Sequence, residues 1–252
     1  MADQLTTTDN SLRYYALGEK AVTVVFGDSI DPKISHKIRL AESVLKNHPF
    51  PGMLSIVAAY TTLCIHYDPF VIRSSVVIEN KSIQAWVMDY LSQLMNSLRE
   101  RADDRPEVVV IPVCYGGTYG PDLEEVAAHT GLSEEDVIAL HTSNTYLVYM
   151  MGFMPGFPYL GGLDERLATP RKKMPRQLVV QGSVGIAGAQ TGVYPLDSPG
   201  GWQLIGRTPL RLFDPTNEQP ILLKSGQQVR FETLDHHHFE AYQRDSYGNK
   251  TS

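Results

Sequence analysis

The sequence predicts an α+β chain in two parts, an N-terminal ferredoxin-like α/β domain followed by a domain made mostly of short strands. Two observations carry this prediction. The first half alternates strand-like and helix-like segments in the order β-α-β-β-α-β, which is the split βαβ pattern. The second half is dense in glycine, since residues 152–206 hold eleven of the twenty glycines, well above the average usage of about 7%.

The first strand and the first helix of the N-terminal layer lie within residues 21–48. AVTVVF (21–26) is rich in β-branched residues and predicts a strand. Asp31 suits a helix N-cap, and Pro32 suits the first helical position, where its missing N–H is not needed. The apolar residues that follow recur at helical spacing and predict one buried stripe: Ile34, Ile38, Ala41 and Leu45.

A hairpin, a second helix and a further strand complete this layer. LSIVAAY (54–60) and LCIHY (63–67) are close enough in sequence to pair as two strands. Residues 82–100 show the apolar periodicity of an amphipathic helix. EVVVIPV (107–113) predicts the last strand of the ferredoxin-like pattern.

Two short helices are expected over residues 121–131 and 133–141, and their outline resembles a helix-turn-helix. Ser133 has the spacing of a capping box, and Gly131 suits the turn between the helices. A recognition helix needs cations and amides toward the DNA. The second helix opens Ser-Glu-Glu-Asp instead, so the sequence argues against nucleic-acid binding.

The second half contains short apolar runs separated by turn signals, as in an all-β barrel or sandwich. We place the domain boundary so that residues 1–105 form the N-terminal domain and residues 106–252 the C-terminal one. The runs that predict strands include TYLVYMM, LVVQG and VGIAG, with PILL (220–223) and QQVRFETL (227–234) as closing strands.

Composition favours a cytoplasmic protein. The net charge of −6 disfavours binding to acidic membranes or nucleic acid, and the N-terminus lacks a signal-peptide pattern. The uncharged run from Val137 to Leu163 is interrupted by polar residues and prolines, so no membrane span is expected. Cys64 and Cys114 lie in apolar strand-like surroundings, which indicates buried thiols in a reducing compartment.

Positive charge in the second half is concentrated in DERLATPRKKMPR (164–176) and GRTPLRLF (206–213). Arginines facing a glycine-rich, apolar cleft would suit an anionic small-molecule substrate, because arginine binds carboxylate or phosphate bidentately. The alternative is that the arginines are solvated and the glycines serve tight turns, and spacing alone leaves both interpretations open. The candidate substrate-binding residues are Arg171, Arg176, Gln181, Ser183, Gln190, Tyr194, Trp202, Arg207 and Thr208.

Several familiar catalytic patterns are absent from the sequence. No phosphate-binding loop of the G-x-x-x-x-G-K-[ST] type occurs, and GSVG (182–185) lacks the spacing of a nucleophile elbow. DHHHF (235–239) is interpreted as a surface cluster, so no metal site is predicted. The sequence therefore names no catalytic residue.

The ordered motifs of the chain resemble one family. GFMPGFPYLGGL, TPRKKMPR, VQGSVGIAGAQTGVYP, SPGGWQLIGRTPLRLFD and GQQVRF, together with AVTVVFGDSIDP and IPVCYGG in the first half, are similar to the B subunit of 5-oxoprolinase. This family is also called allophanate hydrolase subunit 1 and includes sporulation kinase inhibitors of the Kip type. The resemblance spans roughly residues 14–234. One departure is Gln227, where the family usually carries an acid after the glycine.

The resemblance implies a cyclophilin-like β-barrel for the C-terminal domain. It also implies a subunit that acts with the C and A subunits of 5-oxoprolinase to open 5-oxoproline to glutamate, with ATP and Mg as co-substrate of the complex. Arg171, Arg176 and Arg207 would then bind the substrate carboxylate or phosphate charge, and Gln190 and Tyr194 would orient the ring. Which of the subunits holds ATP is left open.

Two alternative functions follow from the same resemblance. The chain could inhibit a sensor histidine kinase by blocking its autophosphorylation, or act in urea or allophanate metabolism. In the first case the apolar loop at 152–162 would be an interaction surface. Its expected partner-binding residues are Phe153, Pro155, Phe157, Pro158 and Tyr159.

Overall fold

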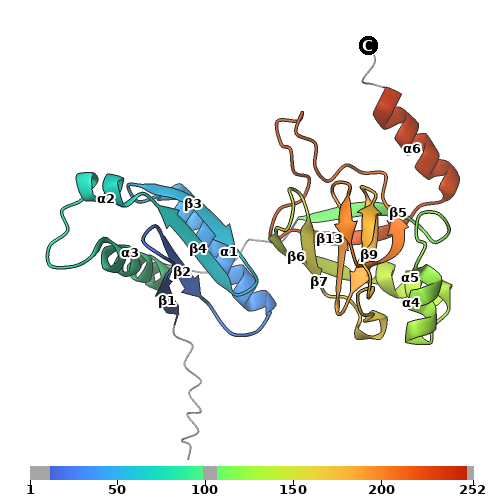
Figure 1. Cartoon of the computed structure of the whole chain (residues 1–252), viewed down its shortest axis with the longest axis horizontal. Helices are drawn as coiled ribbons and strands as arrows, with labels where there is room; N and C mark the ends of the chain where they lie inside the picture. The colour runs from blue at the N-terminus through green and yellow to red at the C-terminus, as the bar shows by residue number, and fades with distance from the viewer. Residues whose placement is uncertain (1–11, 99–106, 249–252) are drawn as a thin grey trace, which may run out of the picture. The chain divides into compact units, whose positions relative to one another are not determined.

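The computed structural model of the protein describes residues 12–98 and 107–248 (Figure 1). The chain divides into two compact units, Met1–Asp104 and Arg105–Ser252. Each unit has a hydrophobic core of its own. The boundary that we predict between residues 105 and 106 lies outside the described residues.

The N-terminal unit is built on a four-stranded antiparallel sheet in the order β1-β2-β4-β3. Two hairpins, β1-β2 and β3-β4, are joined by helix α1, and two further helices follow. The elements are β1 (Arg13–Ala16), β2 (Ala21–Val25), α1 (Pro32–Asn47), β3 (Met53–Ala58), β4 (Thr62–Tyr67), α2 (Pro69–Ser75) and α3 (Ile83–Ser97).

Helix α1 forms as the sequence predicts. The Asp31 carboxylate accepts a hydrogen bond from the Lys33 N–H at 2.6 Å, and Pro32 is the first helical residue. The predicted apolar stripe points into the core, where Ile38 and Leu45 are buried. They pack there with buried residues of β2, β4 and α3, so α1 and α3 cover the same face of the sheet.

The ferredoxin-like arrangement predicted for the N-terminal domain is not confirmed. The unit begins with a strand that the sequence pattern did not predict, β1, which pairs with β2 through a turn at Gly18 (φ 65°). The strand predicted at 107–113 belongs to the C-terminal unit, where Ile111 and Val113 are buried in the barrel core. Strand period alone cannot choose a pairing partner, and β13 offers this strand a full-length neighbour.

The C-terminal unit contains a closed barrel of seven strands in the order β10-β7-β6-β13-β5-β12-β9, which fits the cyclophilin-like expectation (Figure 1). Strands β5 and β13 run parallel, and β8 and β11 form a separate two-stranded sheet. The elements are β5 (Val108–Tyr115), α4 (Leu123–Thr130), α5 (Glu134–Ser143), β6 (Thr145–Met151), β7 (Pro158–Gly161), the 3-10 helix η1 (Glu165–Leu167), β8 (Arg176–Val179), β9 (Ser183–Ala187), β10 (Gln190–Val193), β11 (Ser198–Gly200), β12 (Gln203–Arg207), β13 (Gln228–Thr233) and α6 (His236–Gly248).

One predicted closing strand is confirmed and one is not. QQVRFETL contains β13. PILL (220–223) forms only an isolated bridge, between Phe213 and Ile221. The chain between β12 and β13 therefore returns as a loop rather than as a further strand of the barrel.

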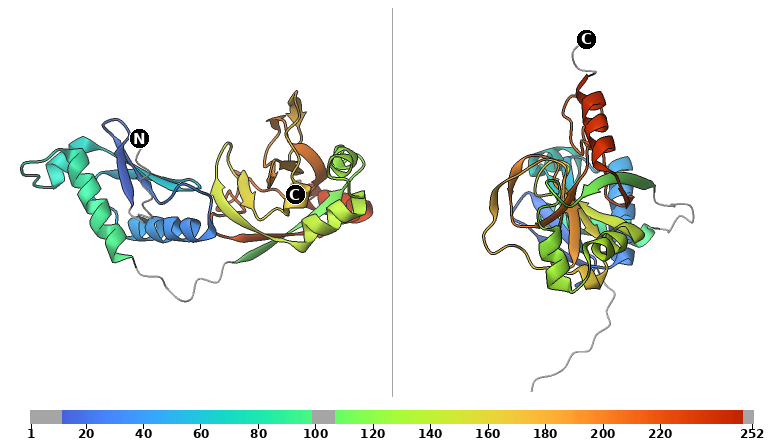
Figure 2. Two further views of the ribbon diagram at one scale, coloured as in Figure 1. Left: turned by 90° about the horizontal axis from the view of Figure 1, so that it is seen from below. Right: turned by 90° about the vertical axis from the view of Figure 1, so that its right-hand side faces the viewer.

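Helices α4 and α5 lie next to one another on the barrel unit (Figure 2). The Ser133 hydroxyl caps α5 by accepting from the Asp136 N–H at 3.1 Å, and Gly131 ends α4 at φ 72°. Val126 and Val137 are fully buried in the barrel core. The apolar sides of both helices are therefore used to cover the barrel, and the acidic first turn of α5 stays exposed.

His141 lies at the end of this helical pair and is completely buried. Its Nδ1 lies 2.8 Å from the Tyr115 hydroxyl and its Nε2 lies 2.9 Å from the Thr191 hydroxyl. Burial lowers the pKa of His141 to about 3. The imidazole is thus a neutral hydrogen-bonding group that ties α5 to the barrel.

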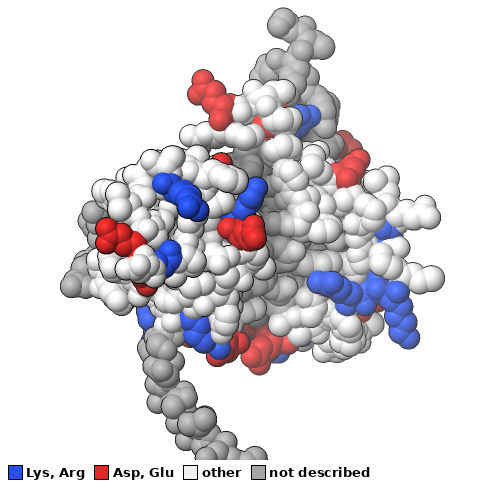
Figure 3. Space-filling view, turned by 60° about the vertical axis from the view of Figure 1, so that its left-hand side comes forward, with Lys and Arg blue, Asp and Glu red and all other residues white. Residues whose placement is uncertain are grey.

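On the face drawn in Figure 3, charged side chains of both signs lie in small groups. Among the described residues, no helix is both long and apolar enough to cross a membrane.

Candidate functional site

An aromatic cluster lies at one end of the barrel unit, where three chain segments meet. Phe157 comes from the β6-β7 loop, Tyr194 follows β10, and Trp202 precedes β12. The Phe157 ring centroid lies 5.6 Å from each of the other two, with interplanar angles of 80° and 87°. Edge-to-face contacts of this kind fix ring orientation as well as burying apolar area. All three rings are almost completely buried.

The loop at 152–162 is a compact turn rather than an extended strap. The Phe157 N–H donates to the Met154 carbonyl at 3.1 Å, and the Gly152 N–H donates to the Phe157 carbonyl at 3.1 Å. Gly156 has φ 82°, and a Cβ there would lie 3.0 Å from Phe213. Glycine at this position therefore lets the turn close, and the turn directs Phe157 into the core.

The loop divides the predicted partner-binding residues between surface and interior. Phe153 is 67% exposed and Pro155 is exposed. Phe157 and Pro158 are buried, and Tyr159 is half-buried. An interaction surface on this loop stays a prediction. Of the five predicted partner-binding residues, only Phe153 and Pro155 are exposed.

A cavity of about 220 Å³ opens beside the cluster, and we call it the aromatic cavity. It brings together three of the predicted substrate-binding residues, Arg171, Tyr194 and Trp202. Its other lining residues are Phe153, Phe157, Tyr159, Lys172, Pro175, Gly200 and Gly201. The cavity thus combines aromatic walls with cations from a single segment.

Gly200 is needed for the shape of this cavity. A Cβ on this residue would lie 2.4 Å from the Tyr194 hydroxyl oxygen, far inside contact distance. A Cβ on Gly201 would meet nothing closer than 3.7 Å. The first glycine of the SPGGW motif is therefore required for the position of the tyrosine, whereas the second is not.

The segment 170–176 is held in place by a charge network centred on the buried Asp122, with Lys172 and Arg176 half-buried and Glu125 exposed. The Lys172 ammonium donates to the Asp122 carboxylate at 2.9 Å and to the Glu125 carboxylate at 2.6 Å. Arg176 Nη2 donates to the same oxygen of Asp122 at 2.6 Å, and the Leu204 N–H donates to the other oxygen at 2.7 Å. Two acids and two bases are therefore paired within this network.

The electrostatics of Asp122 follow from these contacts. Burial alone raises the pKa of its carboxyl group, since the charged form loses water. Hydrogen bonds from Arg176, Lys172 and the Leu204 N–H outweigh burial, so the pKa lies below its usual value. Asp122 is thus charged in the folded protein, and it fixes the segment that carries Arg171.

Arg176, another predicted substrate-binding residue, lies in the charged network, and its role in substrate binding stays a prediction. Its Nη2 is committed to Asp122, and its side chain is 27% exposed. Nη1 is buried and has no hydrogen-bond partner among the described residues. Arg176 does not line the aromatic cavity. Sequence pattern could not show this pairing, because the two residues are fifty-four positions apart.

Arg207 and Ser183 lie on adjacent barrel strands, away from the aromatic cavity. They face each other in the β9-β12 register. The Arg207 guanidinium lies 5.5 Å from the centroid of the Tyr119 ring, a cation–π contact. Ser183 is fully buried, and its hydroxyl has no partner in the described part of the chain.

The other predicted residues also lie outside the cavity lining. Gln181 donates its backbone N–H to the Asp197 carboxylate at 2.7 Å. Thr208 is buried, and its hydroxyl accepts from the Leu210 N–H at 3.2 Å. Gln190 begins β10. These residues serve turns and strand ends in the structure.

The residues that sequence reasoning missed are Lys172, Asp122 and Gly200. Lys172 appeared in the sequence only as one cation of a basic run, and Asp122 as one acid of a helix start. The available signal for Gly200 was the Gly-Gly pair directly before a tryptophan. No sequence pattern connects Asp122 with Lys172, because the contact is purely tertiary.

The histidine run is exposed, as the sequence suggests. One donor atom from each of Asp235, His237 and His238 lies within 4.8 Å of the others, and all three residues are exposed. The Asp235 carboxylate caps α6 by accepting from the His238 N–H at 2.8 Å. Both cysteines are free thiols, and burial raises the pKa of Cys114.

Comparison with known proteins identifies the family. A family model described as carboxyltransferase domain, subdomain C and D, matches residues 12–223. The 5-oxoprolinase B subunit from Bacillus subtilis (strain 168) is 43% identical over 230 residues, which cover 91% of this chain and 96% of that protein. The 5-oxoprolinase B subunit from Escherichia coli O157:H7 is 45% identical over 222 residues, covering 87% and 94%.

More distant relatives include the urea amidolyase of Lachancea kluyveri, which is 22% identical and of which this chain covers 14%. Among solved structures, TTHA0988 superposes with a TM-score of 0.74 at 38% identity, over 86% of this chain and 40% of that one. PH0987 from Pyrococcus horikoshii gives a TM-score of 0.52 at 37% identity, over 90% of this chain and 100% of that one. The chain belongs to the family of 5-oxoprolinase B subunits, within the carboxyltransferase subdomain C and D proteins.

Proposed function

We propose that this chain is the B subunit of a heteromeric, ATP-dependent 5-oxoprolinase, that it acts with the A and C subunits, and that its aromatic cavity binds the 5-oxoproline. The observation that carries the proposal is the presence of Arg171 in a small aromatic cavity of a chain that is 43–45% identical to proteins of this name. Pockets for drug-sized ligands hold about 300–1,000 Å³, so a cavity of about 220 Å³ suits a smaller ligand.

The chemistry of the substrate matches the lining. 5-Oxoproline has a flat, partly apolar lactam ring and one carboxylate. In this proposal the ring lies in the cavity against the lining aromatic side chains, and the carboxylate pairs with the guanidinium of Arg171. Within the described residues Arg171 makes no hydrogen bond or ion pair, so its donors are available to a ligand.

Ring opening needs ATP because the lactam amide is stabilised by resonance. The lactam oxygen attacks the γ-phosphorus of ATP, the bond to the β-phosphate oxygen breaks, and ADP leaves. Water then adds to the activated carbon, and the carbon–nitrogen bond breaks as the nitrogen takes a proton. A second water hydrolyses the resulting acyl phosphate to glutamate and phosphate. The role of this chain is to hold the carboxylate and the ring during these steps.

The test is conversion of 5-oxoproline to glutamate by this protein with the candidate A and C subunits, ATP and Mg²⁺. Each component is omitted in turn. Arg171→Ala is expected to lower kcat/KM by an amount equivalent to about 2–4 kcal/mol, as for other well-placed donors. Arg230→Ala is the matched control, because Arg230 forms an exposed ion pair with Glu232 on β13.

Turnover that requires this chain, and that falls with Arg171→Ala but not with Arg230→Ala, supports both the function and the cavity. Absence of turnover in a folded, associated mixture overturns the enzyme assignment. The kinase-inhibitor alternative would then be tested by adding this protein alone to a sensor histidine kinase. Turnover that Arg171→Ala leaves unchanged overturns the cavity assignment only.

A further inference from the structure

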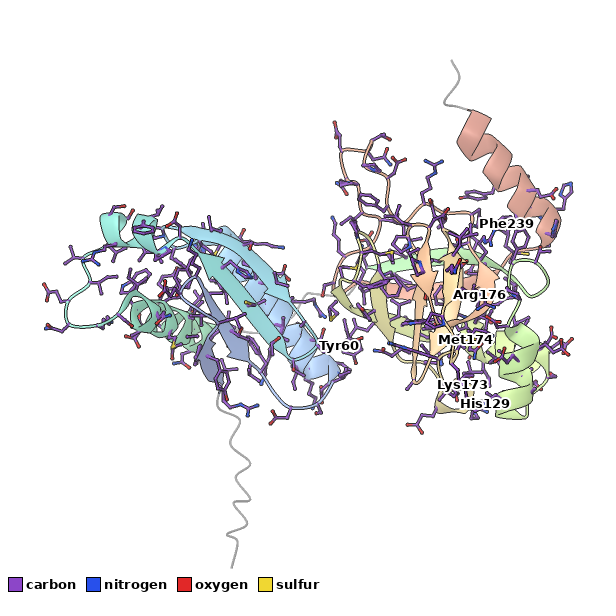
Figure 4. All side chains as sticks on the ribbon, in the orientation of Figure 1. Tyr60, His129, Lys173, Met174, Arg176 and Phe239 are labelled. Atoms are coloured by element: carbon purple, nitrogen blue, oxygen red, sulfur yellow. The ribbon has the colours of Figure 1, made fainter. Side chains whose placement is uncertain are left out.

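A second cavity, of about 430 Å³, lies on the same segment of chain as the aromatic cavity, and we call it the cationic cavity. Arg171 and Lys172 line both cavities. The cationic cavity also receives Lys173 and Met174 from the segment and His129 from the last turn of α4. Figure 4 shows Lys173 and His129 at the same end of the barrel unit, with Met174 close by.

The charges at this cavity do not balance. Glu125, an acid in its lining, accepts from the Lys172 ammonium at 2.6 Å. Arg176 and Lys172 also neutralise Asp122. This leaves Arg171 and Lys173, which form no ion pair or hydrogen bond in the described part of the chain.

The wall of the cationic cavity is also different in kind from that of the aromatic cavity. It contains no phenylalanine, tyrosine or tryptophan ring, and its polar side includes Gln203, whose amide nitrogen donates to Glu125 at 3.3 Å. A guanidinium, an ammonium and an imidazole around an open space suit a multiply charged, hydrated anion better than a flat organic ring. Phosphate groups have this chemistry, and arginine and lysine are their usual partners in proteins.

We propose that the cationic cavity binds phosphate groups, with Lys173 and His129 on its far side and Arg171 between the phosphate and the aromatic cavity. This inference rests on the proposed function for its biological meaning, because the phosphates of ATP would then lie beside the 5-oxoproline in the aromatic cavity. The binding itself does not depend on turnover. It can therefore be tested on this protein alone.

The experiment measures binding by calorimetry with three probes: inorganic phosphate, tripolyphosphate, and ATP with and without Mg²⁺. Lys173→Ala is expected to weaken tripolyphosphate binding about tenfold or more, the effect of removing one charge-assisted contact. Lys224→Ala is the matched control, because this residue lies outside both cavities of the same unit. Circular dichroism establishes that each variant is folded.

A double dissociation distinguishes this inference from the proposed function. Lys173→Ala should weaken phosphate binding and leave 5-oxoproline binding unchanged. Gly200→Ala should weaken 5-oxoproline binding and leave phosphate binding unchanged. Arg171→Ala should weaken both. Tighter binding of ATP than of tripolyphosphate supports a nucleotide site, and equal binding supports a site for the phosphate chain alone. Absence of binding by all three probes, or binding that Lys173→Ala and Arg171→Ala leave unchanged, overturns the inference.

Discussion

Asp122 and His141 are both buried in the C-terminal unit, yet one side chain is held charged and the other neutral. Asp122 meets two cations and a backbone N–H, whose hydrogen bonds outweigh the cost of burial. His141 meets two hydroxyl groups, so nothing offsets the loss of water and the imidazole stays unprotonated.

The two networks also lie at different places in the barrel unit. The neutral network joins a helix to the barrel inside the core. The charged network holds Lys172 and Arg176 of the segment that lines both cavities, whereas Arg171 of the same segment forms no hydrogen bond or ion pair among the described residues. If the proposed cavities bind charged ligands, these fixed charges would lower the reorganisation needed on binding.

The largest expected effect comes from breaking the charged network. Asp122→Ala removes the acid paired with Arg176, one of the two acids paired with Lys172, and the acceptor of the buried Leu204 N–H, which should lower the free energy of unfolding by about 3–5 kcal/mol. Urea unfolding followed by tryptophan fluorescence measures it. A Trp86→Phe background leaves Trp202 as the only tryptophan, so the signal reports the C-terminal unit.

Glu232→Ala is the control for this prediction, because it removes an exposed ion pair with Arg230 from the same unit. Exposed pairs contribute about 1 kcal/mol or less. Equal effects of Asp122→Ala and Glu232→Ala would show that the buried network does not stabilise the unit.

The neutral network should appear in the pH dependence of stability. The pKa of His141 is lowered to about 3 in the folded state, whereas an unfolded histidine titrates near 6.5. The unfolded state therefore takes up a proton first as pH falls, and stability is lost from pH 6.5 downward. Between pH 6.5 and 4.5 the loss should reach about 2 kcal/mol.

Asp122 affects the pH dependence of stability at lower pH than His141 does. Its pKa is lowered below about 3.8, so its contribution is complete above that pH and is lost only as pH falls further. Urea unfolding of the wild type and of His141→Gln between pH 4.5 and 7.5 measures the contribution of His141, because the contribution of Asp122 is constant over this range. An equal pH slope in both proteins would contradict the assignment of this loss to His141.

A smaller effect is expected from a substitution that changes the shape of the aromatic cavity. Gly200→Ala would place a Cβ 2.4 Å from the Tyr194 hydroxyl, so the ring must move and 5-oxoproline binding should weaken about tenfold. Gly201→Ala is a matched control, since its Cβ would meet only ordinary contacts of 3.7 Å. Calorimetric titration with 5-oxoproline tests both variants. Equal affinities would refute the claim that Gly200 shapes the binding cavity.

The smallest expected effect is on stability at Phe153. This residue has φ 67°, a region that costs a non-glycine residue about 1–2 kcal/mol, and its side chain is 67% exposed. Phe153→Gly relieves that strain but adds freedom to the unfolded chain, so stability should change by less than about 1 kcal/mol.

The same variant should still weaken 5-oxoproline binding, because Phe153 lines the aromatic cavity. Urea unfolding and calorimetry of this variant test both expectations together. A large loss of stability with unchanged affinity would show that the exposed ring packs structurally instead of serving the cavity.

Local sequence signals were sufficient for several helix ends and for the family, although they missed β1 and wrongly predicted a strand at residues 220–223. Asp31 and Pro32 predicted the start of α1, Ser133 and Gly131 predicted the ends of α5 and α4, and the ordered glycine-rich motifs predicted a barrel and the B subunit of 5-oxoprolinase. These signals are local or are carried by long ordered motifs, so they can be interpreted without knowing which segments meet.

Strand pairing and charge pairing, in contrast, depend on contacts between distant segments. The strand at 107–113 joined the barrel because β13 pairs with it, a choice that strand period does not encode. Arg176, one of the predicted substrate-binding residues, is paired with Asp122, whereas Arg171 forms no hydrogen bond or ion pair among the described residues. Chain segments about fifty residues apart meet at this network. Sequence spacing gives no distances between such segments, so it cannot show which cations pair with an acid and which do not.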